Sequence, residues 1–193
     1  MLRRNFIKKI LLFSLAFLSL KTKIMANSLF KPFNMEDGIF LNNYVLHKSS
    51  FKDFWKWRKE SNKPQPISFP VVKNNPSYLK SNKSEKTITW VGHSTFLIQI
   101  DGVNILTDPH FSKRASPLSF MGPSRTTPPG LNIDDLPFID LVLISHNHYD
   151  HLDAKTIKLL LKKQNINQPI FFVPLKLKET ISKLGARNVI EHE

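Results

Sequence analysis

The segment of residues 139–153, which reads IDLVLISHNHYDHLD, constrains the fold more than any other part of the chain. Its residues 141–144 form a continuous apolar run that is short and rich in β-branched side chains. Such a run predicts a strand that is buried on both faces of a sheet. The run stops at Ser145, and four side chains that can bind a metal ion follow within six residues. The segment therefore predicts a metal site at the carboxyl end of a buried strand.

The candidate metal ligands are His146, His148, Asp150 and His151, and Asp150 is also the candidate catalytic residue. Imidazole nitrogens combined with a carboxylate oxygen suit zinc or iron. In an extended loop, His146 and His148 can point at one position, while Asp150 and His151 face a second position nearby. The alternative is a solvent-exposed histidine pair. A shuffled chain of this composition would give the pattern HxHxDH on the order of once in a thousand tries or less, which favours the metal site.

Apolar and polar residues alternate upstream of this segment, which predicts antiparallel strands. Asp101-Gly102 is a two-residue hairpin signal, and Gly92-His93-Ser94 marks an earlier turn. Downstream, apolar residues at helical spacing alternate with short apolar runs. The predicted strands are residues 87–91, 95–100, 103–107, 141–144, 169–173 and 187–190, and the predicted helices are residues 154–163 and 175–184. A hairpin followed by β-α-β-α-β order predicts an α/β (α+β) fold.

Three segments carry a resemblance to a known family. They are WVGHSTFLIQ at residues 90–99, LTDPHFSKRASPLSFMGPSR at residues 106–125 and SHNHYDHLD at residues 145–153. Together they resemble metallo-β-lactamase-fold hydrolases of the branch that contains N-acylphosphatidylethanolamine-hydrolysing phospholipase D, with the ascorbate-phosphate lactonases as more distant relatives. The resemblance covers residues 55–192. It implies that the fold is the N-terminal half of an αββα sandwich.

The resemblance implies a zinc-dependent hydrolase that cleaves a phosphodiester with a hydroxide bridging two divalent metal ions. By that resemblance, His146 and His148 bind the first ion, and Asp150 and His151 bind the second. It also implies further ligands from the second half of the fold, namely one histidine for each ion and an aspartate that bridges both. His192 is the only histidine after His151, and its surroundings, VIEHE, do not resemble the downstream motifs of the family. We therefore expect no complete two-ion site in this polypeptide alone.

The enzymes of this family are considerably longer, and the chain ends where they are about half finished. We therefore expect an incomplete phospholipase-D-like hydrolase or, as alternatives, a non-catalytic remnant, one half of a split hydrolase, or a relative that acts on sugar-phosphate lactones. A half sandwich exposes one apolar sheet face. For that reason we also expect poor solubility, self-association or a complementing C-terminal chain.

Five residues are candidates for supporting roles at the site. The resemblance implies that Asp108 helps to orient the metal loop, the segment of residues 145–153 that carries the candidate ligands, with strand-end capping as the alternative. His93 is expected near the cleft but not as a ligand. Asp153 is expected to cap the following helix or, instead, to hold an imidazole. Arg114 and Arg125 lie in a proline-rich loop and are candidates to meet a phosphate or another charged part of the substrate, with surface ion pairs as the alternative.

The first 26 residues predict a targeting segment. Arg3 and Arg4 belong to a basic stretch, and residues 10–20 form an apolar run that spans only about half of a ~30 Å hydrocarbon core. The stretch RRNFIKK resembles a twin-arginine export signal. We therefore expect a periplasmic or inner-membrane-associated protein, with the cytoplasm as the less favoured location. Residues 27–86 are expected to form a proline-punctuated extension, and residues 87–193 an incomplete metallo-β-lactamase-like domain.

Charge and composition narrow the choice of partners. Removing the six lysines and arginines of residues 1–26 lowers the net charge from +13 to +7, which still favours anionic phospholipids or phosphoesters. No basic run is interleaved with aromatic residues, so nucleic acid is not expected. The chain has no cysteine, which excludes disulfides and thiolate ligands. Residues 50–60, the only helical candidate in the extension, predict an amphipathic helix that packs on the main domain or binds a membrane surface.

Overall fold

The structure, a computed structural model, describes residues 35–36, 39–40, 50–61, 67, 70, 72 and 74–192. The chain divides into two units, Met1–Gln65 and Pro66–Glu193. The predicted targeting segment, residues 1–26, lies outside the described residues. Within the described part of the chain, no helix is both long enough and apolar enough to cross a bilayer.

The first unit contains a short antiparallel pair and a helix. β1 (Met35–Glu36) pairs with β2 (Ile39–Phe40), and α2 (Phe51–Glu60) confirms the predicted helix. The helix begins at a capping box, in which the Ser50 hydroxyl accepts from Asp53 N–H and the Asp53 carboxylate accepts from Ser50 N–H. No residue of α2 is buried, and its aromatic side chains contact one another. The aromatic surface of α2 is therefore exposed.

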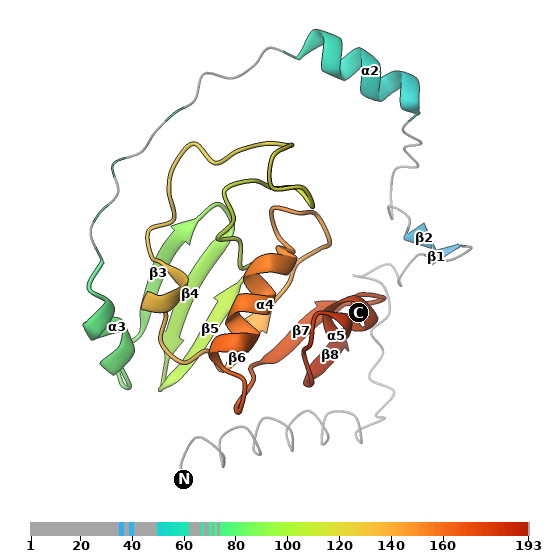
Figure 1. Ribbon diagram of the computed structural model, residues 1–193. Helices are drawn as coiled ribbons and strands as arrows, with labels where there is room; N and C mark the ends of the chain where they lie inside the picture. Colours follow the sequence, from blue (N-terminus) through green and yellow to red (C-terminus); the bar gives the residue numbers. More distant parts are fainter. Residues whose placement is uncertain are drawn as a thin grey trace, which may run out of the picture. The chain divides into compact units, whose positions relative to one another are not determined.

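The second unit is built on one six-stranded sheet with the order β3-β4-β5-β6-β7-β8 (Figure 1). β3, β4 and β5 pair in antiparallel fashion, and β6, β7 and β8 continue the sheet parallel to β5. The strands are β3 (Thr87–Gly92), β4 (Thr95–Ile100), β5 (Val103–Thr107), β6 (Leu141–Leu143), β7 (Ile170–Pro174) and β8 (Val189–His192). Asp101 and Gly102 both adopt positive φ, as a tight two-residue hairpin requires. The predicted α/β fold class is confirmed.

Helices pack on one face of this sheet and form the core with it (Figure 1). They are α3 (Pro76–Ser81), the short 3₁₀ helix η1 (Ile133–Asp135), α4 (Ala154–Lys163) and α5 (Lys178–Lys183). As predicted, α4 buries Ile157, Leu160 and Leu161. These side chains share one cluster with Leu106 and Phe171 of the strands. Because α4 follows the metal loop directly, this packing fixes the end of that loop.

The helix α3 was not predicted, because it is short and lies in a proline-rich stretch. Pro76 suits its first turn, and the Asn75 side chain caps it by accepting from Tyr78 N–H at 3.1 Å. Leu79 of α3 lies in the core, and the buried Gln99 amide on β4 donates to Leu79 O at 2.8 Å. The core thus includes residues that precede the predicted domain start at position 87.

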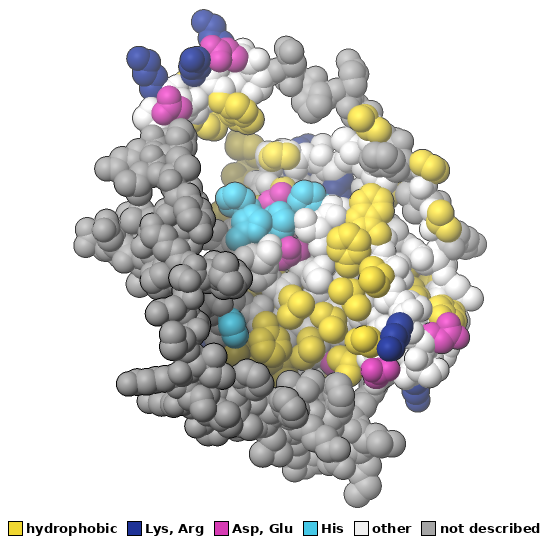
Figure 2. All heavy atoms as spheres, turned by 180° about the vertical axis from the view of Figure 1, so that it is seen from behind, with side chains coloured by type: hydrophobic (Ala, Val, Ile, Leu, Met, Phe, Trp, Pro, Cys, Tyr) yellow, Lys and Arg dark blue, Asp and Glu magenta, His cyan; other side chains and the backbone are white. Residues whose placement is uncertain are grey.

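The opposite face of the sheet carries exposed and half-buried apolar side chains (Figure 2). The strand registers align them in two rows across the sheet. One row contains Ile88, Ile98, Ile105, Leu141 and Ile170, and the other contains Trp90, Phe96, Leu143, Phe172 and Ile190, with the polar Thr107 between Phe96 and Leu143. Leu143 is 36% exposed whereas Val142 is buried, so the prediction that residues 141–144 are buried on both faces is wrong. An apolar run does not tell what covers each face. Self-association and poor solubility stay predictions.

Candidate metal centre

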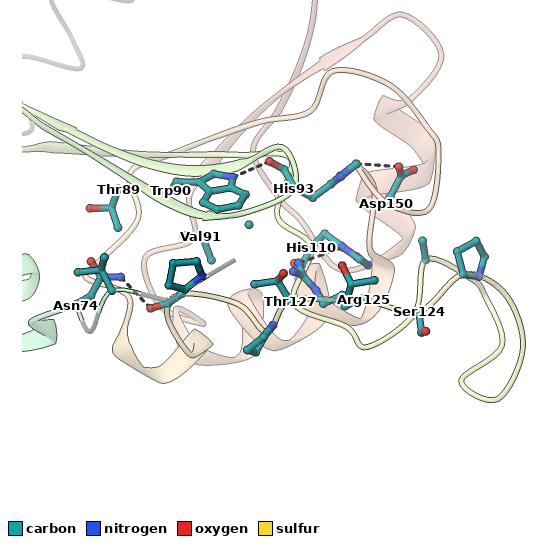
Figure 3. A pocket seen from close by; sticks show the side chains of 18 of the residues that line it. Asn74, Thr89, Trp90, Val91, His93, His110, Ser124, Arg125, Thr127 and Asp150 are labelled. Atoms are coloured by element: carbon teal, nitrogen blue, oxygen red, sulfur yellow. Dashed lines mark hydrogen bonds and ion pairs between the residues drawn. The ribbon is translucent and has the colours of Figure 1, made fainter. Parts of the chain in front are cut away.

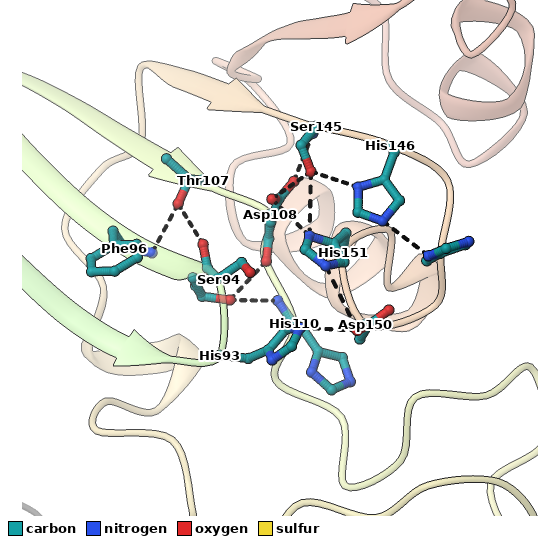
Figure 4. A network of polar contacts seen from close by, with 12 residues as sticks. His93, Ser94, Phe96, Thr107, Asp108, His110, Ser145, His146, Asp150 and His151 are labelled. Carbon is teal, nitrogen blue, oxygen red and sulfur yellow. Dashed lines mark hydrogen bonds and ion pairs between the residues drawn. The ribbon is translucent and has the colours of Figure 1, made fainter. Parts of the chain in front are cut away.

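The histidine-rich segment after β6 is fixed at both ends. At its start, Ile144 N–H donates to Phe172 O at 3.0 Å, which extends the pairing of β6 with β7. At its end, the Leu152 side chain is buried in the core. Between these points, the N–H groups of His151 and Leu152 both donate to His148 O, at 3.0 Å and 2.7 Å. The segment therefore forms a compact turn at the carboxyl end of the strand (Figure 4).

This turn brings the four predicted metal ligands together. His146 Nε2 lies 3.0 Å from His148 Nδ1, and the ring centroids of His146 and His151 are 4.0 Å apart. Asp150 Oδ2 lies 3.6 Å from His151 Nε2. The four side chains thus gather at the mouth of the sheet, as their spacing predicted, while their roles as ligands stay predictions.

His93 joins the cluster from the turn between β3 and β4. Its Nε2 lies 2.9 Å from Asp150 Oδ2, and its ring centroid is 5.0 Å from that of His151. His93, Asp150 and His151 each offer one ligand atom, and these atoms all lie within 4.8 Å of one another. The sequence predicts His93 near the cleft but not among the ligands, because its distance from Asp150 depends on the strand order.

Asp108 lies beside the metal loop at the end of β5 (Figure 4). Its Oδ1 accepts from Ser145 N–H and its Oδ2 accepts from the Ser145 hydroxyl, both at 2.7 Å. Oδ2 also lies 2.9 Å from His151 Nδ1. Because an ionised carboxylate only accepts hydrogen bonds, this contact puts the His151 proton on Nδ1 and leaves the Nε2 lone pair for a metal ion. These contacts support the predicted orienting role of Asp108.

Asp153 caps α4 and also holds the loop that follows β5. Its Oδ1 accepts from the backbone N–H groups of Lys155 and Thr156, at 3.1 Å and 3.2 Å. Its Oδ2 accepts from Ser112 N–H at 3.0 Å and from the Thr156 hydroxyl at 2.6 Å. In the described part of the chain, its hydrogen bonds include no imidazole, which favours the capping role. Burial alone would raise the pKa of Asp153, but the hydrogen bonds from Thr156 and Ser112 lower it overall.

The two predicted arginines make contacts within their own loop. Arg114 Nη1 donates to Gly122 O at 2.6 Å. Arg125 is half-buried, and it donates from Nε to Ser112 O at 3.2 Å and from Nη2 to His110 O. Burial lowers the pKa of Arg125. Both arginines therefore fold the loop against itself, and a contact with phosphate stays a prediction.

His110 is a site residue that was not predicted, because its position in the DPHF segment carries no spacing signal. The side chain is buried, and its Nδ1 lies 3.3 Å from Arg125 Nη2. Since an arginine nitrogen only donates, the His110 proton belongs on Nε2. Nε2 is buried and has no hydrogen-bond partner among the described residues. Burial, assisted by the Arg125 charge, lowers the pKa of His110.

A cavity of about 590 Å³ opens beside the cluster (Figure 3). His93 and Asp150 lie at its polar end, whereas Val72, Ile88 and Trp90 contribute apolar wall. This size and mixed lining are typical of sites for small organic ligands. A ligand with a polar group at the cluster and an apolar portion along the wall would fit the arrangement.

The donor set fits a divalent metal ion. Ligand atoms of a tetrahedral zinc ion lie about 3.3 Å apart. The distances from Asp150 Oδ2 to His93 Nε2, 2.9 Å, and to His151 Nε2, 3.6 Å, bracket that value. Burial lowers the pKa of His146. Burial would raise the pKa of Asp150, but its own backbone N–H and the nearby His151 and His93 lower it overall, and metal binding requires an ionised carboxylate.

Replacing Asp153 with asparagine tests the helix cap and its pH dependence. Because the folded-state pKa of Asp153 is lowered, the stability that its carboxylate contributes is present above the ordinary pKa of 3.8 and is lost as the pH falls below it. We expect Asp153→Asn to reduce the free energy of unfolding by about 1–3 kcal/mol at pH 7 and by less at acidic pH below 3.8, measured by urea denaturation. Asp134→Asn, at an exposed position, is the matched control. An equal loss at both pH values would contradict this role.

Comparison with known proteins places the chain in a family. The sequence pattern described as "Beta-lactamase superfamily domain" matches residues 87–191. An uncharacterised protein of Mycobacterium bovis is 36% identical over 148 residues, which make up 74% of this chain and 39% of that protein. The N-acyl-phosphatidylethanolamine-hydrolyzing phospholipase D 1 of Caenorhabditis elegans is 46% identical over 98 residues, which make up 50% of this chain and 27% of the worm protein.

Among solved structures, a metallo hydrolase from Ignicoccus hospitalis is similar at 25% identity and a TM-score of 0.38, over 55% of this chain and 39% of that chain. The chain thus spans about two fifths or less of the length of these relatives. The family pattern covers more than half of the chain, from the first strand of the sheet to the last. This chain therefore belongs to the family of proteins that contain a beta-lactamase superfamily domain.

Proposed function

We propose that this chain carries the metal site of a zinc-dependent hydrolase, and that this site is sufficient to cleave a phosphodiester bond in an N-acyl phospholipid. The observation that carries the proposal is the cluster of histidines and Asp150 at the polar end of a cavity with an apolar wall. The name of the worm relative supports the substrate class. Since the chain spans 27% of that relative, activity and substrate are both part of the proposal.

Different residues of the chain would bind the metal ion, accept a hydrogen bond from water and contact the acyl chain. A bound divalent ion supplies Lewis-acid polarisation of the phosphoryl group and lowers the pKa of a water molecule. His151 is oriented for ligation because Asp108 holds its Nδ1. Asp150 lines the cavity, so its carboxylate can accept a hydrogen bond from a water molecule that attacks the phosphorus. Trp90 and Ile88 offer apolar surface along which an acyl chain can lie out of water.

Substitution of Asp150 tests this function directly. We expect the zinc-loaded chain to hydrolyse N-acylphosphatidylethanolamine, chelation to abolish the reaction, and Asp150→Asn to lower the rate by at least about 100-fold, because the carboxylate serves both ligation and proton transfer. Product release is measured by mass spectrometry. Asp134→Asn, an exposed aspartate in η1, should keep the full rate. Metal-independent turnover, or an unchanged rate in Asp150→Asn, would rule the proposal out.

The exposed sheet face favours a second candidate function, that of one half of a split hydrolase. One of its two rows of side chains runs across all six strands and the other across five, and apolar surface of this kind is normally covered by another layer. In that case the isolated chain binds zinc but hydrolyses neither N-acyl phospholipids, simple phosphodiesters nor sugar-phosphate lactones. Turnover by the chain alone would exclude this second candidate.

We further infer that α2 binds an anionic membrane surface, and that the chain is exported and is periplasmic or associated with the inner membrane. Support for the membrane contact comes from the aromatic side chains of α2, all substantially exposed: Phe51 75%, Phe54 47%, Trp55 54% and Trp57 63%. The same helix carries four basic residues, Lys52, Lys56, Arg58 and Lys59, against two acidic ones. Aromatic and basic residues together suit the interface of a bilayer with anionic lipids.

The aromatic residues of α2 can be tested with vesicles. We expect the chain to sediment with vesicles of phosphatidylcholine and phosphatidylglycerol more strongly than with pure phosphatidylcholine, since the basic residues add electrostatic attraction. A Trp55→Ser, Trp57→Ser double variant should bind at least about 10-fold more weakly because two large apolar groups are lost. Ile166→Ser, an exposed isoleucine outside α2, is the control. Unchanged binding of the double variant would refute the role of α2.

A further inference from the structure

The turn between β3 and β4 holds His93 in a backbone conformation that is unusual for a residue other than glycine. Its φ is +51°, in the left-handed region that residues other than glycine seldom occupy. The indole N–H of Trp90 donates to His93 O at 2.9 Å and stabilises this turn. Strained backbone of this kind persists where the surroundings enforce it and concentrates at functional sites. Here the conformation is accompanied by a contact of 2.9 Å between His93 Nε2 and Asp150 Oδ2.

The strand directions explain why this turn meets the metal loop. β3 and β5 are both antiparallel to β4, and β6 is parallel to β5, so β3, β5 and β6 all run the same way. His93, Asp108 and the metal loop follow these three strands and therefore lie at one edge of the sheet. This placement is a property of the sheet and does not depend on any residue outside the described part of the chain.

We propose that His93, Asp150 and His151 form a three-ligand site for one divalent ion. The proposal deepens the proposed function, on which it rests for the presence of an ion. Asp150 Oδ2 lies between the two imidazoles, 2.9 Å from His93 Nε2 and 3.6 Å from His151 Nε2, near the spacing of about 3.3 Å in a tetrahedral zinc site. The contact of His151 Nδ1 with Asp108 leaves Nε2 as the ligand atom.

Two histidines and a carboxylate are a ligand set that catalytic zinc sites use, with the fourth position left to water or substrate. His93 and Asp150 both line the cavity, so an ion held by these residues would border the space where a substrate would lie (Figure 3). Among the described residues, this is the group of three whose ligand atoms lie within 4.8 Å of one another. His146 and His148 supply a neighbouring pair. The chain therefore holds one complete three-ligand site, although a complete two-ion site is not expected within it.

Cobalt(II) titration of the full chain, followed by visible absorption, tests this site. We expect one equivalent to give the intense spectrum of a four-coordinate ion. His93→Asn should weaken cobalt binding by at least about 100-fold and change the spectrum, because asparagine tolerates positive φ but is too short to reach the ion. His192→Asn, a substitution of the same kind on β8, should leave affinity and spectrum unchanged. If the His93 variant fails to fold, ring ¹⁵N shifts of wild-type His93 on adding one equivalent of zinc replace the variant measurement.

The outcomes separate this proposal from the proposed function. Wild-type affinity and spectrum in His93→Asn, or an unshifted His93 ring in the zinc complex, would overturn the three-ligand site while the metal-dependent function stands. The same holds if His148→Asn alone abolishes binding of the first equivalent, since the His146–His148 pair would then be the tight site. A wild-type chain that binds no cobalt and no zinc would overturn the proposed function together with this site.

Discussion

The hydrogen bonds of one carboxylate, that of Asp108, organise the site. The residue follows β5 at a φ of +35°, with its N–H donating to Leu143 O at 2.8 Å and its O accepting from the Thr95 hydroxyl at 2.7 Å. Its side chain accepts two hydrogen bonds from Ser145 and contacts His151 Nδ1. A buried charge is costly unless it is hydrogen-bonded, and here several donors surround it. The ends of β4, β5 and β6 are thereby joined, and His151 is oriented with them.

The two faces of the sheet serve different purposes in this arrangement. One face packs against the helices and gives the rigid support that a precise ligand geometry needs. The edge at the carboxyl ends of β3, β5 and β6 carries the candidate ligands, and the cavity opens beside it. The other face presents apolar side chains from all six strands. The site is therefore supported by the covered face, while the uncovered face is available to a further layer.

Much of the fold follows from local sequence patterns. Alternation and the Asp101-Gly102 signal predicted the hairpin strands, and helical spacing predicted the buried face of α4. The exposure of Leu143 could not be predicted, because an apolar strand looks the same whether or not its second face is covered. The predicted helix over residues 175–184 is shorter in the structure, at Lys178–Lys183. Its ends depend on contacts with neighbouring segments that a local pattern does not contain.

The candidate site was predictable only as far as residues close in sequence were concerned. The spacing of His146, His148, Asp150 and His151 predicted that they gather, since one turn of chain suffices to do so. His93 and His110 come from other segments, and their distances to the site follow from strand order and loop packing. The roles of these residues as metal ligands, the number of metal ions and the export of the chain stay predictions. None of the three follows from how the side chains of this chain pack against one another.

The zinc affinity of Asp108→Asn tests most directly whether this carboxylate organises the site. Asparagine keeps the size of the side chain but loses the charge and one acceptor, so we expect zinc affinity to fall about 10–100-fold in a competition titration with a chelator. Asp153→Asn, which alters another buried carboxylate that has no imidazole among its hydrogen bonds in the described structure, should bind zinc as the wild type does. An Asp108→Asn variant with unchanged affinity would contradict the central claim.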